Sequence, residues 1–208
     1  MEIEFKYHLD SEEVVDEILA DEKVMAWKDA DSYEELPMEA AYFDTADRRL
    51  NREGITFRVR REGRRIVGTL KWNGHSEDGM HEREEINVPH VGEESLVTPQ
   101  VDIFRQSPMC ETLKKIVGFR ELQRTVTIRF LRRQVRIDTG KAICELSFDE
   151  GEVEYQGQKA PIREMEIELY SGSRQEMEKF GAYLAGKYDL QPENRSKFRQ
   201  GIELRADK

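Results

Sequence analysis

The chain has 208 residues, of which 38% are hydrophobic and 37% are charged. It can therefore form the buried core of one domain over residues 1–208. An unusually large share of charged residues must then lie on the surface or inside a site. The net charge of -10 argues against a protein that wraps nucleic acid through a general basic field. No apolar run approaches a membrane span, no signal-peptide pattern opens the chain, and Cys110 and Cys144 suggest neither a disulfide framework nor a zinc motif. We expect a cytoplasmic protein that binds neither nucleic acid nor membrane.

The first predicted element is a strand. In the opening MEIEFKYHL, Glu2, Glu4 and Lys6 alternate with apolar residues. A strand projects successive side chains to opposite faces, so one face here is charged and the other is apolar. Most half-buried strands turn such charges to water. This stretch alone leaves open whether its charges face solvent or the inside of a site.

The following elements are read from capping patterns, periodicity and turn residues. Asp10 with Glu13 resembles a capping box and predicts a helix with an apolar stripe from Val14 to Val24. Residues 39–45 are predicted to form a strand. Residues 54–73 are predicted to form a hairpin around Glu62 and Gly63, and residues 79–88 a further strand.

The second half of the chain is also rich in predicted strands. Residues 110–117 are predicted to form a short helix, and residues 122–157 a meander with turns near 132–133, 139–140 and 150–151. A last strand over 162–170 precedes a helix capped by Ser173 with Glu176, and residues 192–204 are predicted to be partly helical. About eight strands with two or three helices predict a mainly β (α+β) fold, a closed antiparallel barrel with helices outside.

Charged residues recur at alternate positions on most of these strands. A solvated sheet face explains any single case, but it gives no reason to sort acids onto some strands and bases onto others. Rows of like charge weaken a sheet, unless a divalent cation lies among the carboxylates and a polyanion among the bases. The acidic row is Glu145 and Asp149, then Glu164, Glu166 and Glu168, and the basic row is Lys6, Arg58, Arg60 and Lys71, with Arg83 and Glu85 sharing one further strand.

These motifs resemble the triphosphate tunnel metalloenzymes, also called the CYTH superfamily. EIEFK matches the ExExK signature of that superfamily, and the remaining motifs follow in family order over nearly the whole chain: YFDT, FRVR, GTLKW, GMHEREEINV, FDEGEV, EMEIEL and NRSKFRQG. The forms of GMHEREEINV and SFDEGEV are most similar to the bacterial inorganic triphosphatase branch. The resemblance implies an eight-stranded tunnel with a charged lumen, inside which Glu2, Glu4 and Lys6 would lie.

The resemblance also implies roles for individual residues. Glu2, Glu4, Glu166 and Glu168 would bind Mg²⁺ or Mn²⁺, and Glu2, Glu4 and Lys6 would form the catalytic set. The triphosphate would be held by Lys6, Arg58, Arg60, Lys71, Arg83, Arg124 and Lys197. Further lumen candidates are Glu85, Glu145, Asp149 and Glu164, with Arg199 marginal and Arg129 an alternative to Arg124 on the opposite face of its strand.

The implied reaction is hydrolysis of inorganic triphosphate to pyrophosphate and phosphate, by a monomer or homodimer acting on a small molecule. Phosphoryl transfer needs positioning and charge neutralisation more than a nucleophilic side chain, and no Ser-His-Asp or Cys-His pattern competes. Three alternatives stay open: an adenylate cyclase of the class IV type, a thiamine or nucleoside triphosphatase, and a polyphosphate-binding module without turnover. We expect His81 to share the lumen face, Trp72 to pack outward, and residues 90–118 to lie over one tunnel mouth.

Overall fold

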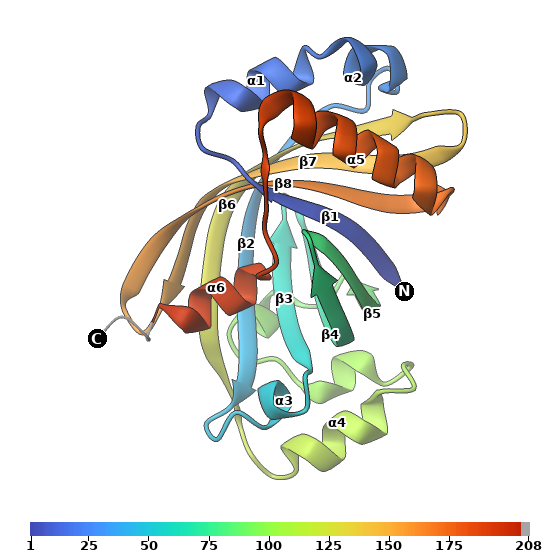
Figure 1. The fold of residues 1–208 in the computed structure, drawn as a ribbon. Coiled ribbons are helices and arrows are strands. Elements are labelled where there is room, and N and C mark those ends of the chain that lie inside the picture. Colours follow the sequence, from blue (N-terminus) through green and yellow to red (C-terminus); the bar gives the residue numbers. More distant parts are fainter. Residues whose placement is uncertain (205–208) are drawn as a thin grey trace.

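Eight long antiparallel strands close into a barrel in the computed structural model, which describes residues 1–204 (Figure 1). Their order around the barrel is β5-β4-β3-β2-β6-β7-β8-β1, and β1 also pairs with β5, which closes the sheet. A two-residue strand, β9 (Gln191–Pro192), adds to β1. The long strands are β1 (Glu2–His8), β2 (Glu34–Thr45), β3 (Thr56–Glu62), β4 (Arg65–Glu77), β5 (Met80–Pro89), β6 (Leu122–Asp138), β7 (Ala142–Tyr155) and β8 (Gln158–Gly172). The predicted closed antiparallel barrel is confirmed.

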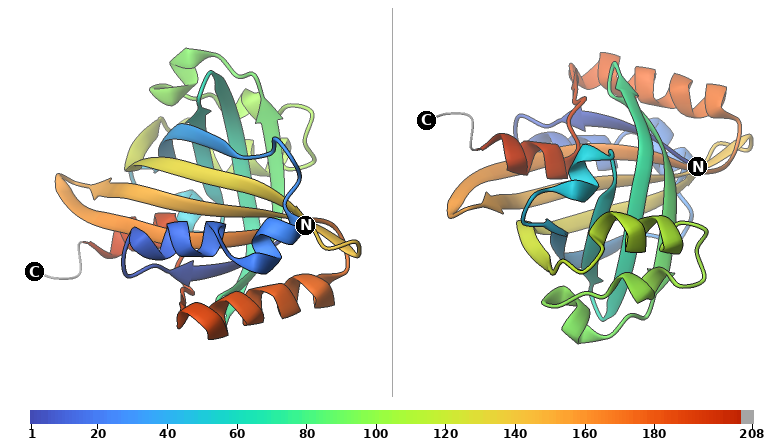
Figure 2. Two further views of the ribbon diagram at one scale, coloured as in Figure 1. Left: turned by 90° about the horizontal axis from the view of Figure 1, so that it is seen from above. Right: turned by 90° about the horizontal axis from the view of Figure 1, so that it is seen from below.

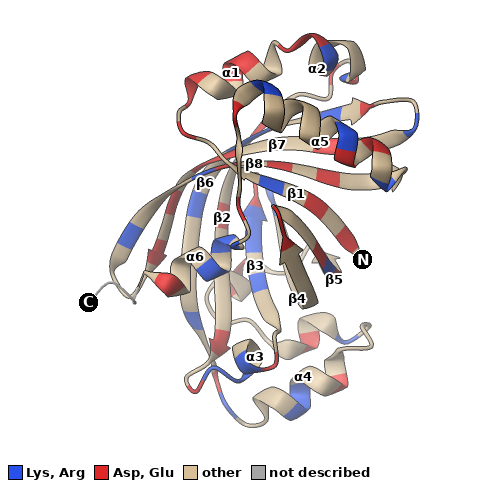
Figure 3. Ribbon diagram, in the orientation of Figure 1, with Lys and Arg blue, Asp and Glu red and all other residues tan. Residues whose placement is uncertain are grey.

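The alternation seen in the sequence becomes an inner and an outer face of the barrel wall. On β1, Glu2, Glu4 and Lys6 line the interior, whereas Ile3 and Phe5 pack outward against a helix-covered core. Side chains alternate between the two faces along every strand of a closed barrel. The register of pairing between strands therefore determines which residues of every strand point inward. The acids and bases that share a parity in the sequence therefore meet inside the barrel. Figure 3 shows how charged positions recur along the strands.

Three helices cover the outside of β1, β7 and β8: α1 (Glu13–Leu19), α2 (Glu22–Trp27) and α5 (Arg174–Tyr188). Figure 2 shows α1 and α2 beside α5 on this side of the barrel. The core beneath them includes Ile18, Phe180 and Leu184, each at most 2% exposed. None of the helices within residues 1–204 is both long enough and apolar enough to cross a membrane.

A second outer core lies beneath residues 90–118. This segment forms two short 3-10 helices, η1 (Glu93–Leu96) and η2 (Val101–Phe104), and the helix α4 (Cys110–Val117). With α3 (Arg49–Arg52) they pack on the outer face of β2, β3 and β4, where Phe104 contacts Phe57 edge to face. The segment contributes no residue to the main cavity of the barrel, so the expectation that it covers a tunnel mouth is wrong.

The helix α6 (Lys197–Glu203) lies against the inner face of the barrel rather than outside it. Phe198 and Ile202 pack on inward residues of β2, β6 and β7, and the Phe198 ring lies 5.2 Å from that of Tyr42. A Cβ atom at Gly201 would lie 2.6 Å from Val126, so only glycine lets the helix approach this closely. The helix α6 therefore fills an apolar part of the interior beside β2, β6 and β7, next to the charged part of the barrel.

Three local predictions are wrong. The expected turns at 132–133 and 150–151 lie within continuous strands, because β6 and β7 each extend well past them. Charged pairs and Gly151 mimic turn signals there, yet Gly151 sits where a Cβ would collide with the backbone of Arg129. The helix predicted from Asp10 begins at Glu13 without a side-chain cap, and it is divided from α2 at Asp21. The Ser173 cap is confirmed, since its hydroxyl accepts from the Glu176 amide.

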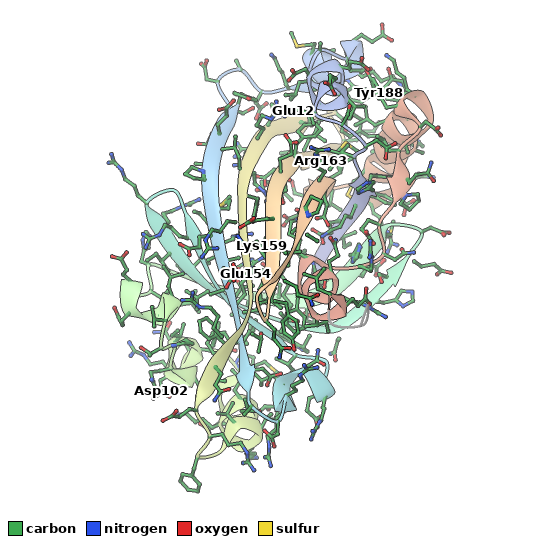
Figure 4. The ribbon with its side chains drawn as sticks, turned by 90° about the vertical axis from the view of Figure 1, so that its left-hand side faces the viewer. Glu12, Asp102, Glu154, Lys159, Arg163 and Tyr188 are labelled. Atoms are coloured by element: carbon green, nitrogen blue, oxygen red, sulfur yellow. The ribbon has the colours of Figure 1, made fainter. Side chains whose placement is uncertain are left out.

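Asp21 ties α2 to α5, and its replacement by alanine is expected to destabilise the fold by about 1–2 kcal/mol. Its carboxylate caps α2 through the Lys23 amide, at 2.8 Å, and accepts from Lys187, Tyr183 and Tyr188 of α5 (Tyr188 is labelled in Figure 4). Burial alone would raise the pKa of Asp21, but these donors lower it to about 2.

Because the pKa of Asp21 is lowered, its contribution to stability should depend on pH. The stabilisation is complete above the ordinary pKa of the carboxyl group, near 4, and it is lost as the pH falls from there toward about 2. Unfolding by urea at pH 7 and at pH 3 should therefore show a smaller difference between Asp21→Ala and the parent protein at pH 3. An equal difference at both values would contradict the assignment.

Candidate active site

The barrel encloses a cavity of about 560 Å³ whose wall is crowded with charge. Acids and bases occur in nearly equal number, although the whole chain carries a net charge of -10. The charge of the cavity lining is therefore nearly balanced, unlike that of the whole chain. The charged lining residues are Glu2, Glu4, Glu62, Glu85, Glu145, Glu166 and Glu168, together with Lys6, Arg58, Arg60, Arg65, Lys71, Arg83, Arg132 and Lys197.

A second cavity, of about 670 Å³, lies toward the tip of the β4–β5 hairpin and α6. It shares Lys71 and Arg83 with the first cavity. The first cavity reaches the opposite rim, where Glu62, Arg65 and Gln134 lie near strand ends. The central bases are thus accessible from two sides, as in a tunnel.

Acidic side chains dominate the wall formed by β1, β8 and β7. Glu4 lies directly opposite Glu168, which in turn lies directly opposite Glu145, so three carboxylates form a row across three neighbouring strands. Like charges opposite one another destabilise a sheet. The pKa of Glu168 is raised to about 8, first by burial and then by the charges of Glu2 and Glu4. Within residues 1–204, no ion pair or hydrogen bond neutralises Glu168.

Basic side chains dominate the facing wall of β3, β4 and β5. Lys71 Nζ lies 2.8 Å from Glu2 Oε1 and 2.6 Å from Glu85 Oε2, and Arg83 Nε lies 2.5 Å from Glu2 Oε2. Burial alone would raise the pKa of Glu2, but these two cations lower it. Unlike Lys71 and Arg83, Arg58 forms no ion pair within residues 1–204.

The Arg58 guanidinium is buried without a counter-ion. Its residue is 9% exposed, its Nη2 donates to Thr69 Oγ1 at 3.3 Å, and the Tyr42 side chain also lies within hydrogen-bonding reach. Among the residues that the structure describes, no carboxylate oxygen lies within the 4.0 Å of an ion pair, and Nε has no hydrogen-bond partner. A buried cation is costly unless an anion neutralises it. The position of Arg58 therefore suits an anionic ligand.

Lys197 of α6 is held by three carboxylates beneath the open part of the cavity. Its Nζ lies 2.7 Å from Asp149, 2.6 Å from Glu164 and 2.7 Å from Glu166. Lys6 Nζ also lies 2.7 Å from Glu166. Burial lowers the pKa of Lys197, but the three carboxylates raise it well above its ordinary value, so the side chain is an ammonium ion. Three converging carboxylates could hold a metal ion, but here an ammonium ion lies at their centre.

Comparison with known proteins agrees with this barrel and its charged interior. A model of the CYTH domain matches residues 1–202. The chain belongs to the CYTH family. This CYTH chain is 29% identical over 166 residues to the inorganic triphosphatase of Haemophilus influenzae, a match that covers 78% of the chain and 44% of that protein. The chain thus spans less than half the length of that curated relative.

Solved structures share the CYTH barrel. A Hippeastrum protein, described as a candidate adenylyl cyclase with a dominant triphosphatase activity, superposes with a TM-score of 0.72 at 19% identity, covering 100% of this chain and 97% of that one. A protein of Pyrococcus horikoshii gives a TM-score of 0.61 at 20% identity, covering 98% and 99% of the two chains. At such identities these likenesses show the fold.

Arg132 is one of three charged lumen residues that the sequence analysis missed, together with Glu62 and Arg65 at the rim. Its Nε and Nη2 each lie 2.7 Å from Asp149, and Nη2 lies 2.6 Å from Glu166. The charges of Asp149 and Glu166 raise its pKa well above the ordinary value, although burial lowers it. The signal was available, because Arg132 shares the parity of Ile128 and Phe130. The incorrectly predicted turn at 132–133 hid it.

The prediction for Arg124 needs correction. Although it shares the parity of Arg132, it lies near the start of the long strand β6, beyond the cavity. Its residue is exposed, and its guanidinium donates to the Leu96 carbonyl on the outer side of the barrel. The alternative, Arg129, points outward to Glu39 and Glu154 (Glu154 is labelled in Figure 4). Neither arginine reaches the lumen.

The remaining predicted residues fall into three groups. Glu2, Glu4, Lys6, Arg58, Arg60, Lys71, Arg83, Glu85, Glu145, Glu166, Glu168 and Lys197 line the main cavity. Asp149 and Glu164 lie beneath it, where Lys197 pairs with both. His81 and Arg199 line the second cavity, where His81 Nε2 lies 2.8 Å from the Glu193 carbonyl and supports the segment that leads to α6. Trp72 packs outward, as predicted.

Proposed function

We propose that this protein is a metal-dependent hydrolase that cleaves inorganic triphosphate to pyrophosphate and phosphate. The observation that carries the proposal is the polarised tunnel: an acidic row on β1, β8 and β7, in which Glu168 forms no ion pair with any described residue, faces buried bases, of which Arg58 forms no ion pair within residues 1–204. A metal-bound triphosphate satisfies both walls together, because the ion meets the carboxylates and the phosphate oxygens meet the bases. The curated relative that is named an inorganic triphosphatase supports the same substrate.

The residues present fit a hard divalent cation, Mg²⁺ or Mn²⁺. Glu4, Glu168 and Glu145 supply oxygen ligands from three adjacent strands, and Glu168 is buried without a neutralising partner. Glu2 lies next to this row but is held by Lys71 and Arg83. Glu166, predicted as a ligand, is engaged by Lys6, Lys197 and Arg132. Glu4 also pairs with Arg83, and Glu145 lies 3.6 Å from Arg132, which leaves Glu168 as the member of this set without an ion pair among residues 1–204. We therefore assign the ion first to Glu168, with Glu4 and Glu145 opposite it on the neighbouring strands, and with Glu2 and Glu166 around them.

The residues of the chain perform the remaining work of the reaction. Arg58, Arg60, Lys71 and Arg83 bind phosphate oxygens and neutralise the charge that spreads over them as a phosphorus–oxygen bond breaks. Lys6 and Lys197 fix the carboxylates of the opposite wall, so that these groups need not reorganise when substrate arrives. When bound, the divalent ion supplies charge neutralisation at the phosphates and lowers the pKa of water. A small anionic substrate is also what the narrow lumen admits.

The test is phosphate release from inorganic triphosphate, ATP and thiamine triphosphate, each with Mg²⁺, Mn²⁺ or EDTA. We expect release from inorganic triphosphate to dominate and to disappear in EDTA. Cyclic AMP formation from ATP without triphosphate hydrolysis would replace this proposal by a cyclase. Tight triphosphate binding without product under any metal would indicate a binding module.

A further inference from the structure

The inner face of β3 carries three charged residues in series: Arg58, Arg60 and then Glu62, which is the last residue of the strand. All three share one parity and line the same cavity. The Glu62 side chain is 10% exposed, yet it lies at the rim, next to Arg65, whose side chain is 61% exposed. An acid therefore stands where a row of bases reaches the tunnel mouth.

Glu62 neutralises the outer end of this row. It accepts two hydrogen bonds from Arg60, one of them from Nε at 2.8 Å, and one from Arg65 Nη2 at 3.3 Å. The deeper Arg58 has no such partner. Along the strand, the innermost cation thus has no ion pair among residues 1–204, the next cation is compensated by Glu62, and an anion lies at the rim. A carboxylate raises the energy of any further anion placed beside it.

The other side chains at this mouth do not offset Glu62. Asn87 and Gln134 are uncharged, and Tyr170 donates to Glu145 at 2.5 Å. The charge of Arg132 also acts on Arg60, but the Arg132 guanidinium is held by Asp149 and Glu166. Arg65 lies at the rim and is largely in water, where its attraction for an anion is screened. The part of the lumen that favours phosphate thus ends at Arg60.

We propose that Glu62 sets the chain length that the tunnel accepts, by repelling a phosphate that extends past Arg60 toward this mouth. The proposal rests on the proposed function and deepens it, since it concerns the same lumen. Inorganic triphosphate would fit between the acidic row and Arg60, whereas inorganic tetraphosphate, which is longer by one phosphate, would bring an anionic group against the Glu62 carboxylate. Glu62 is a specificity residue in this assignment, and it also orients Arg60.

The experiment measures the dissociation constants of inorganic triphosphate and inorganic tetraphosphate by titration calorimetry in EDTA, where the proposed metal-dependent hydrolysis does not interfere. Glu62→Gln keeps a side-chain oxygen for Arg60 but removes the charge. We expect it to tighten tetraphosphate binding by about 10-fold relative to triphosphate binding, since like-charge contacts weigh heavily in discrimination. Arg65→Glu, a change at an exposed site that should not disturb folding, is expected to weaken tetraphosphate binding more than triphosphate binding.

Glu39→Gln is the matched control, because Glu39 lies on the neighbouring strand β2 and faces outward to Arg129. It removes the same charge and should leave the ratio of the two constants unchanged. An unchanged ratio in Glu62→Gln, an equal gain for both ligands, or failure of the parent protein to bind triphosphate at millimolar concentration would each overturn the inference. Failure of the proposed function alone has a different signature: selective binding without phosphate release when metal is added.

Discussion

Glu168→Gln is expected to lower metal-dependent triphosphate hydrolysis by about 100-fold or more, because it removes a charged ligand from the proposed ion site. The same change should stabilise the protein when no metal is present. Glu168 lies opposite Glu4 and Glu145 and forms no ion pair of its own among residues 1–204, so a neutral side chain relieves repulsion across three strands. One substitution is thus predicted to have opposite effects on activity and on metal-free stability.

The stabilising effect should also depend on pH. The folded pKa of Glu168, about 8, lies above its ordinary value, so the folded protein holds this proton more tightly than the unfolded chain does. The free energy of unfolding of the parent protein in EDTA therefore falls as the pH rises from about 4.5 to about 8. The glutamine variant has no such titrating group at this position and should not show this decrease. Thermal unfolding in EDTA should show a larger gain for Glu168→Gln at pH 9 than at pH 6.

The control is Glu154→Gln, on the outer face of β7, where the carboxylate is 35% exposed and pairs with Arg129 and Lys159. It should change neither the activity nor the effect of Mg²⁺ or Mn²⁺ on the melting temperature. If Glu168→Gln keeps the metal-induced rise in melting temperature of the parent protein, the ion does not bind at Glu168 and the assignment of the ligands is wrong.

The alternation of charge and apolar side chains predicted the barrel because strand parity is a local property. Glu2, Glu4 and Lys6 alternate with apolar residues that are stable only when buried. When the sheet closes into a barrel, one of these two sets lies on the inner face and the other on the outer face. Sorting of acids and bases onto different strands indicated which face turned inward. The long strands β6 and β7 were harder to predict, because Arg132, Arg133 and Gly151 resemble turn residues when only near neighbours are considered.

The sequence predicted most of the charged residues that line the cavity, but not which cation pairs with which carboxylate. The sequence placed Lys197 among the phosphate-binding residues, whereas its ammonium group lies among Asp149, Glu164 and Glu166. Which cation meets which carboxylate depends on cross-strand register and on the depth of α6 inside the barrel. Both are set by tertiary packing, including the close approach at Gly201, and neither leaves a periodic signal in the sequence.

Arg132→Met is expected to destabilise the protein by about 3 kcal/mol or more, because breaking a buried ion pair leaves a charge without compensation. Arg132 gives Asp149 two hydrogen bonds and Glu166 a third, within a side chain that is 7% exposed. Arg129→Met is the matched control: it lies on the same strand but faces outward, is 48% exposed, and forms exposed pairs that contribute little. Urea unfolding at pH 7 measures both variants.

The outcome for Arg132→Lys separates charge from geometry. Lysine keeps the positive charge but cannot present two parallel N–H groups to Asp149 and a third to Glu166, so it should recover only part of the lost stability. Full recovery would mean that net charge alone holds the acidic wall. Partial recovery, with hydrolysis reduced more than stability requires, would mean that the arginine fork holds Glu166 in position between Lys6 and Lys197. In that case the buried ion network beneath the cavity is what keeps the acidic wall ready for a metal-bound triphosphate.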